Sequence, residues 1–136
     1  MSNSEKIIGI WEGNYRYLHN KYNTKIGNFT MEILESNSNE FIGIISDDTE
    51  GRQSSIKGNF EDSIITFTKT YYSVELTDEN SNKKRIEHKN YVKYEGQLTS
   101  EKEFYGTWFS KPQKIKYQGK EYEIKAEQGS WSAKKQ

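Results

Sequence analysis

The sequence predicts an all-β fold: one antiparallel, up-and-down β-barrel of about eight strands, forming a single domain over residues 1–136. Apolar and polar residues alternate with a period of two along the chain, which places successive side chains on opposite faces of a sheet. All three tryptophans lie in Gly-x-Trp motifs, at 9–11, 106–108 and 129–131. The first motif falls in the first predicted strand and the last motif in the final one, so closure of the sheet would bring them into one aromatic core.

Eight strands are predicted, separated by turns rich in Asn, Asp, Ser and Gly. They cover residues 7–18, 26–35, 40–47, 53–60, 63–74, 86–98, 103–110 and 122–134. Short connectors favour antiparallel neighbours, and the segment 47–51 is interpreted as a solvated hairpin turn. The two longer connectors, 75–85 and 111–121, have the same parity in a meander, so both are expected to be mobile loops at the same end of the barrel. Pro112, the only proline, lies in the second of them. Because proline has no backbone N–H, its absence from the predicted strands leaves each strand residue able to donate a hydrogen bond within the sheet.

The glycine and aromatic residues set the register of each strand. The opposite phase carries mostly polar side chains, such as Glu12, Lys57 and Lys93, and this contrast indicates which face is the core. The predicted inward set is Gly9, Trp11, Gly13, Tyr15, Tyr17, Phe29, Met31, Ile33, Phe41, Gly43, Ile45, Ile56, Gly58, Phe60, Ile65, Phe67, Lys69, Tyr71, His88, Asn90, Val92, Tyr94, Gly96, Leu98, Phe104, Gly106, Trp108, Gly129, Trp131 and Ala133.

Composition limits the classes of partner. Hydrophobic residues are only 32% of the chain while aromatic residues are 14%, so the core is expected to depend on large rings. Twenty basic and twenty acidic residues cancel, which favours neither nucleic acid nor a membrane as a partner. The chain has no cysteine, so thiolate catalysis and thiolate metal sites are excluded. With no apolar signal segment before the first strand, the expected location is cytoplasmic.

On these residues the chain resembles the calycin group of barrels, which includes lipocalins and avidins, and it is similar to uncharacterised bacterial lipocalin-like proteins. The resemblance rests on Gly- and aromatic-marked strands at 9–15, 41–43, 56–58, 67–71, 94–96, 106–108 and 129–131. Fatty-acid-binding proteins of the same group insert a two-helix lid after the first strand, and 19–25 is too short for one, so the helix-free avidin-like plan fits better. The resemblance implies a ligand-binding lumen and supplies no catalytic residue.

Eight inward residues form the predicted ligand site: Tyr15, Tyr17, Lys69, Tyr71, His88, Tyr94, Trp108 and Trp131. Lys69 lies between Phe67 and Tyr71 in the inward phase, so its ammonium group needs a partner. That partner is either an aromatic face, which is a structural cation-π contact, or an anionic group of a ligand. The phenols either orient a polar ligand or fill the core with their hydroxyls at the rim.

No arrangement of residues indicates a cofactor, a metal or an enzyme. His19 and His88 are far apart and match no metal-ligand motif, and no catalytic triad, P-loop or dinucleotide turn is present. The leading hypothesis is therefore non-enzymatic binding of a small, partly polar or anionic ligand in an aromatic-lined lumen. Two long loops would gate its open end, where basic residues form either a rim or a solvated surface: Lys83, Lys84, Arg85, Lys111, Lys114, Lys116 and Lys120.

The alternative is a protein–protein interaction barrel, such as an inhibitor or an immunity-type protein, with a side-chain-filled core. Four aromatic residues are out of phase and are predicted on the outer wall: Tyr72, Tyr91, Tyr105 and Phe109. Such a patch marks an interface with a protein partner or a second copy in a homodimer. An open lumen favours the first hypothesis, and a filled lumen favours the second.

Overall fold

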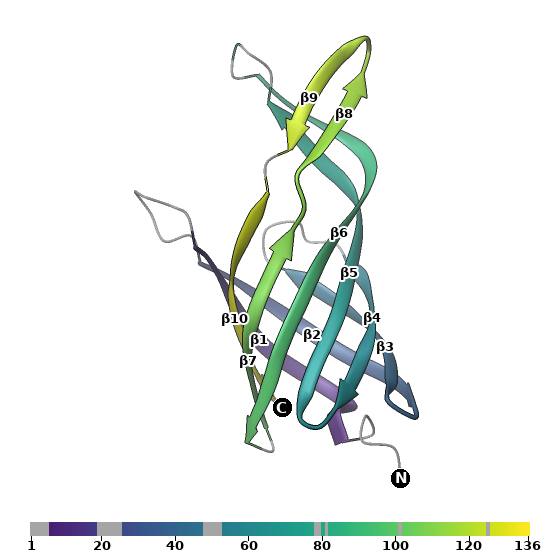
Figure 1. The fold of residues 1–136 in the computed structure, drawn as a ribbon, viewed down its shortest axis with the longest axis vertical. Coiled ribbons are helices and arrows are strands. Elements are labelled where there is room, and N and C mark those ends of the chain that lie inside the picture. Colours follow the sequence, from purple (N-terminus) through teal and green to yellow (C-terminus); the bar gives the residue numbers. More distant parts are fainter. Residues whose placement is uncertain are drawn as a thin grey trace.

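A computed structural model shows a closed antiparallel barrel of eight strands, which confirms the predicted fold class (Figure 1). It describes residues 6–18, 26–47, 53–77, 80, 82–100, 102–124 and 126–136; His19 and the predicted turn beyond residue 47 lie outside this set. The barrel strands are β1 (Gly9–Tyr17), β2 (Ile26–Asn37), β3 (Glu40–Asp47), β4 (Gln53–Glu61), β5 (Ile64–Thr77), β6 (Lys83–Ser100), β7 (Glu103–Ser110) and β10 (Glu127–Lys135).

The strands follow one another around the barrel, and the first strand pairs with the last. The order is β1-β10-β7-β6-β5-β4-β3-β2, and β1 pairs with β10 from Trp11 opposite Lys135 to Tyr17 opposite Gly129. The barrel is therefore closed by the two strands that carry the terminal Gly-x-Trp motifs. Within the described residues, no helix is long and apolar enough to cross a membrane.

The segment after β7 is a hairpin, which corrects the prediction of a loop at 111–121 and of a last strand beginning at 122. Strands β8 (Gln113–Tyr117) and β9 (Lys120–Ile124) form a separate two-stranded sheet. Gln118 and Gly119 connect them with φ values of 52° and 79°, as a tight hairpin turn requires at both central positions.

Strands β5 and β6 run beyond the barrel wall, through much of the segment predicted as the 75–85 loop. Their pairing continues past a bulge between Tyr71 and Ser73 to Thr77 opposite Lys83. Leu76 is buried there against Ile115 of β8, in a second apolar cluster with Tyr71, Ile86, Tyr117, Tyr122 and Ile124. The predicted loops therefore do meet at one end of the molecule, but as packed strands (Figure 1).

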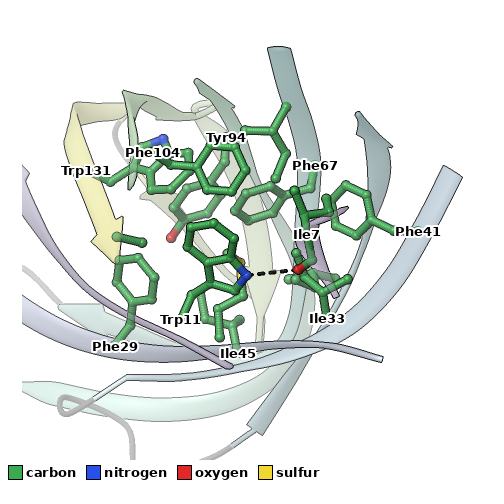
Figure 2. Close-up of a cluster of buried hydrophobic side chains, with 14 of the residues drawn as sticks. Ile7, Trp11, Phe29, Ile33, Phe41, Ile45, Phe67, Tyr94, Phe104 and Trp131 are labelled. Carbon is green, nitrogen blue, oxygen red and sulfur yellow. Dashed lines mark hydrogen bonds between the residues drawn. The ribbon is translucent and has the colours of Figure 1, made fainter. Parts of the chain in front are cut away.

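The predicted register is confirmed, because every residue of the inward set is buried or half-buried. At the end opposite the hairpin, rings fill the lumen (Figure 2): Trp11 packs 4.5 Å from Phe104, and Phe67 stacks 4.6 Å from Tyr94. Ile7 is fully buried in a 3₁₀ turn before β1, and its carbonyl accepts the Trp11 indole N–H at 2.9 Å. Side chains therefore plug this base of the barrel.

Two of the Gly-x-Trp motifs accommodate each other across the β7–β10 pair. Gly106 is opposite Trp131, and Gly129 is opposite Trp108. A Cβ on Gly106 would lie 2.7 Å from the Trp131 Nε1, and a Cβ on Gly129 would lie 2.6 Å from the Trp108 Nε1. Each glycine thus makes room for the indole of the neighbouring strand. Gly9 of the first motif instead has φ 136°, a conformation that other residues rarely adopt.

Candidate functional site

Polar side chains gather inside the barrel at the end that the β8–β9 hairpin shares. They occupy the last inward positions of their strands, beyond the rings of the base. Ser54, Lys69 and Asn90 are buried there with exposed fractions of 6%, 8% and 1%. We call this set the mouth layer: Tyr15, Tyr17, Asp47, Ser54, Lys69, Tyr71, His88 and Asn90.

Lys69 has a protein carboxylate as its partner. Its Nζ lies 2.8 Å from Asp47 Oδ2, and the two side chains are only 10% and 12% exposed. The Tyr71 ring centroid lies 5.8 Å from the same nitrogen, so the predicted cation-π contact is secondary to an ion pair. Interpreting Asp47 as part of a solvated turn was wrong, because it continues the inward alternation of Phe41, Gly43 and Ile45.

Phenols and one indole form the aromatic side of the mouth layer. The Tyr17 ring meets the Trp108 ring edge-on at 4.9 Å, and Tyr15 meets Tyr17 at 6.0 Å. Burial raises the pKa of Tyr17 well above its ordinary value, with smaller contributions from Glu127, Tyr15, Asp47 and Tyr71. Tyr17 is therefore a neutral hydroxyl group that can donate or accept a hydrogen bond.

A chain of amide contacts links the barrel to the hairpin. His88 Nε2 lies 2.9 Å from Gln113 Oε1, and Gln113 Nε2 donates to Asn90 Oδ1. Asn90 Nδ2 is buried and has no hydrogen-bond partner among the described residues. Exchanging nitrogen and oxygen in both amides preserves the chain and leaves Asn90 Oδ1 unpaired instead. In either assignment, one buried polar atom of Asn90 has no hydrogen-bond partner in the part of the chain that the structure describes.

The structure divides the eight predicted site residues into two groups. Six of them contribute to the mouth or its wall: Tyr15, Tyr17, Lys69, Tyr71, His88 and Trp108. The other two, Tyr94 and Trp131, lie deeper among the core rings of Figure 2. The Trp131 indole N–H donates to the carbonyls of Glu95 and Thr107, both at 3.2 Å.

Four residues at the mouth were absent from the predicted site. Asp47, Ser54 and Asn90 were detectable, since each continues the inward alternation of its strand. Gln113 was not, because it lay in a segment predicted to be a loop, and its contact depends on how the hairpin packs.

The outer wall also carries the features that the sequence indicated. Tyr72, Tyr91, Tyr105 and Phe109 are exposed by 59%, 48%, 52% and 40%. The basic residues expected at the rim, from Lys83 to Lys120, are all exposed at the mouth end. Lys114 lies 3.8 Å from Glu121 across the hairpin, so part of this charge is locally balanced.

Comparison with known proteins adds no family assignment: neither the protein-family models, nor the curated proteins, nor the solved structures gave a match.

Proposed function

We propose that this protein binds a small, neutral, partly flat molecule at the mouth layer, without catalysing a reaction. The observation that carries the proposal is the unpaired, buried amide atom of Asn90. A buried polar group without a partner costs about 1–3 kcal/mol. A ligand that supplies a hydrogen bond there recovers this free energy, and the apolar lumen walls shield that bond from water.

The charge of the mouth layer favours a neutral ligand over an anionic one. Asp47 already neutralises Lys69 at 2.8 Å, so a carboxylate entering the layer would have to displace a protein carboxylate. The hydroxyl of Tyr17, which burial keeps protonated, offers a further neutral hydrogen-bonding group. A carbonyl or hydroxyl group on the ligand matches this set.

The rings at the mouth favour a flat apolar portion in the ligand. Tyr17 and Trp108 form an edge-to-face pair, and Tyr71 packs against both apolar clusters. Eight-stranded barrels hold one small ligand in lipocalins and streptavidin, so the closed meander supports a calycin-like use of the lumen. The ring-filled base confines the proposed site to the mouth.

The β8–β9 hairpin acts as the cover of the proposed site. Its contacts to the barrel strands include the hydrogen bonds of Gln113 with His88 and Asn90, and the apolar cluster around Leu76 and Ile115. Asn90 is only 1% exposed, so a ligand reaches it after Gln113 moves aside. The ligand's polar group then pairs with the buried amide atom of Asn90 that has no partner among the described residues.

Binding of 7-methoxycoumarin, a flat neutral lactone, tests the proposal by fluorescence titration. We expect saturable binding that Asn90→Leu weakens by up to about tenfold, the value of one hydrogen bond. Asn59→Leu is the matched control, because it makes the same chemical change on the exposed outer face of β4. Native mass spectrometry of freshly purified protein reports a retained ligand and the number of subunits.

Two results would contradict the proposal. One is tighter binding of the anionic probe 8-anilinonaphthalene-1-sulfonate than of the coumarin, with no change in Asn90→Leu. The other is saturation by neither probe together with a mass spectrum of unliganded protein.

A further inference from the structure

The outer wall of β4, β5, β6 and β7 carries a surface on which lysines and aromatic rings alternate. Lys57, Thr68, Lys93 and Phe109 lie in one lateral row, because each is the register partner of the next. Tyr91 is two residues from Lys93 on the same face of β6. We call the set Tyr72, Tyr91, Phe109, Lys57, Lys89 and Lys93 the lysine–aromatic wall.

The cations of this wall have no ion-pair partner among the residues that the structure describes. Among the described residues, no carboxylate lies within ion-pair distance of Lys57, Lys89 or Lys93. Lys89 instead places its Nζ 5.6 Å from the Tyr91 ring centroid, and hydrogen bonding with the Tyr91 side chain raises the pKa of its ammonium group. Two acidic residues of β6 share this face: Glu87 lies two residues before Lys89, and Glu95 lies two residues after Lys93 and lines the groove beside it.

A groove of about 360 Å³ runs along the wall between the lysines. At one end of the groove, Lys57 and Lys93 line its two sides with Thr68 between them. The neighbouring row of the lining is Asn59, Thr66 and Glu95, so one carboxylate of the protein lies at the other end. The two lysines stand two strand spacings apart, roughly 10 Å. A carboxylate of a partner placed over Thr68, at the end of the groove away from Glu95, is therefore flanked by two ammonium groups and has a hydroxyl donor beside it.

From this charge complementarity we propose that the lysine–aromatic wall docks an acidic segment of a partner protein. Glutamate or aspartate side chains of that segment lie in the groove, while its apolar side chains cover the Tyr91 and Phe109 rings. Exposed tyrosine and phenylalanine are enriched at protein interfaces and supply much of their binding energy. A second copy of this chain fits poorly, because a two-fold axis through the wall would place lysine against lysine. The wall faces away from the lumen, so the inference is independent of ligand binding at the mouth.

Fluorescence anisotropy with a short labelled peptide of alternating glutamate and leucine tests the proposal. We expect binding at low salt that weakens as salt is added, because surface charges are screened. The double variant Lys57→Glu/Lys93→Glu should bind about tenfold more weakly, and Tyr91→Ala should weaken binding several-fold. Lys102→Glu/Lys120→Glu is the matched control, since it makes the same change in net charge at exposed positions away from the wall.

Four binding results would overturn the proposal. They are no binding of the acidic peptide, equal binding of the same peptide with lysine in place of glutamate, equal loss in the control variant, and binding of oligothymidylate in preference to the peptide. The last would assign the wall to single-stranded nucleic acid. A fifth overturning result is a dimer in sedimentation that Tyr91→Ala dissociates, which would assign the wall to a second copy. Because every altered residue is exposed, an unchanged urea midpoint verifies that each variant is folded, and unchanged coumarin binding verifies that the mouth is intact.

Discussion

The buried ion pair of Lys69 and Asp47 gives the sharpest test of the mouth layer. At 2.8 Å and an effective dielectric constant of about 20, the attraction between the two charges is roughly 6 kcal/mol. Desolvation of the two ions offsets most of this attraction, so the pair itself adds little to the free energy of unfolding. Removing one partner is different, since the other charge then stays buried without its counter-ion.

We therefore expect Lys69→Met and Asp47→Leu each to lower the free energy of unfolding by about 3 kcal/mol. With a urea slope of ~2 kcal/mol per M, such a loss lowers the midpoint by roughly 1.5 M. The double variant Lys69→Met/Asp47→Leu should return to within about 1 kcal/mol of the wild type, because no unpaired charge remains. Urea unfolding followed by the fluorescence of the three buried tryptophans measures all of these changes.

The exposed pair Lys134–Glu103 is the control for this cycle. Its atoms lie 3.4 Å apart, but Lys134 is 71% exposed, so Lys134→Met should cost less than about 1 kcal/mol. The reasoning fails if Lys69→Met costs no more than Lys134→Met, or if the double variant loses the sum of the two single losses. If the Tyr71 ring were the main partner, Asp47→Leu would leave Lys69 satisfied and would cost little.

Three further predictions concern the core. Trp11→Ala should cost about 3–5 kcal/mol, because the fully buried indole packs on Phe104; a urea midpoint near the wild-type value would contradict this packing. Gly106→Ala should prevent folding as judged by circular dichroism, since its Cβ would lie 1.9 Å from the backbone oxygen of Glu95. Gly119→Asn is the control and should fold, because a Cβ at Gly119 meets nothing within 4 Å and asparagine tolerates positive φ. Burial raises the pKa of Tyr94 above its ordinary value of 10.0, so the folded state retains this proton longer than the unfolded state and stability falls as pH rises above about 10. Tyr94→Phe should flatten that fall in the urea midpoint, and an unchanged slope would show that other groups cause it.

The barrel was predictable because a period of two, once fixed by a glycine or a ring, determines the face of every residue in a strand. The same rule places the side chains of Asp47 and Asn90 inside the barrel. Asp47 was nevertheless interpreted as a turn residue, because aspartate is common in turns. The true partner of Lys69 was harder to identify, because the contact joins positions 22 residues apart on non-neighbouring strands.

The β8–β9 hairpin and the fit of each tryptophan against a glycine of the neighbouring strand could not be predicted from strand patterns alone. Strand β8 has only five residues and is rich in lysine, so its composition resembles a solvated loop; its burial depends on Leu76, which itself lay in a predicted loop. The reciprocal fit of Gly106 with Trp131 depends on the register between β7 and β10, which a single sequence does not specify. Local sequence patterns therefore predict which face of its strand a residue occupies, whereas the residues it contacts depend on tertiary packing.

The two ends of the lumen place different demands on the sequence. At the base, rings and aliphatic side chains fill the space and stabilise the fold through buried apolar area. At the mouth, the buried Lys69–Asp47 pair and the unpaired Asn90 atom are poor sources of stability, because well-packed apolar residues in their place are often neutral or stabilising. Stability alone therefore does not account for a polar layer at this end. A ligand that pairs with Asn90 beneath the hairpin would account for it, and this is why we propose binding at the mouth.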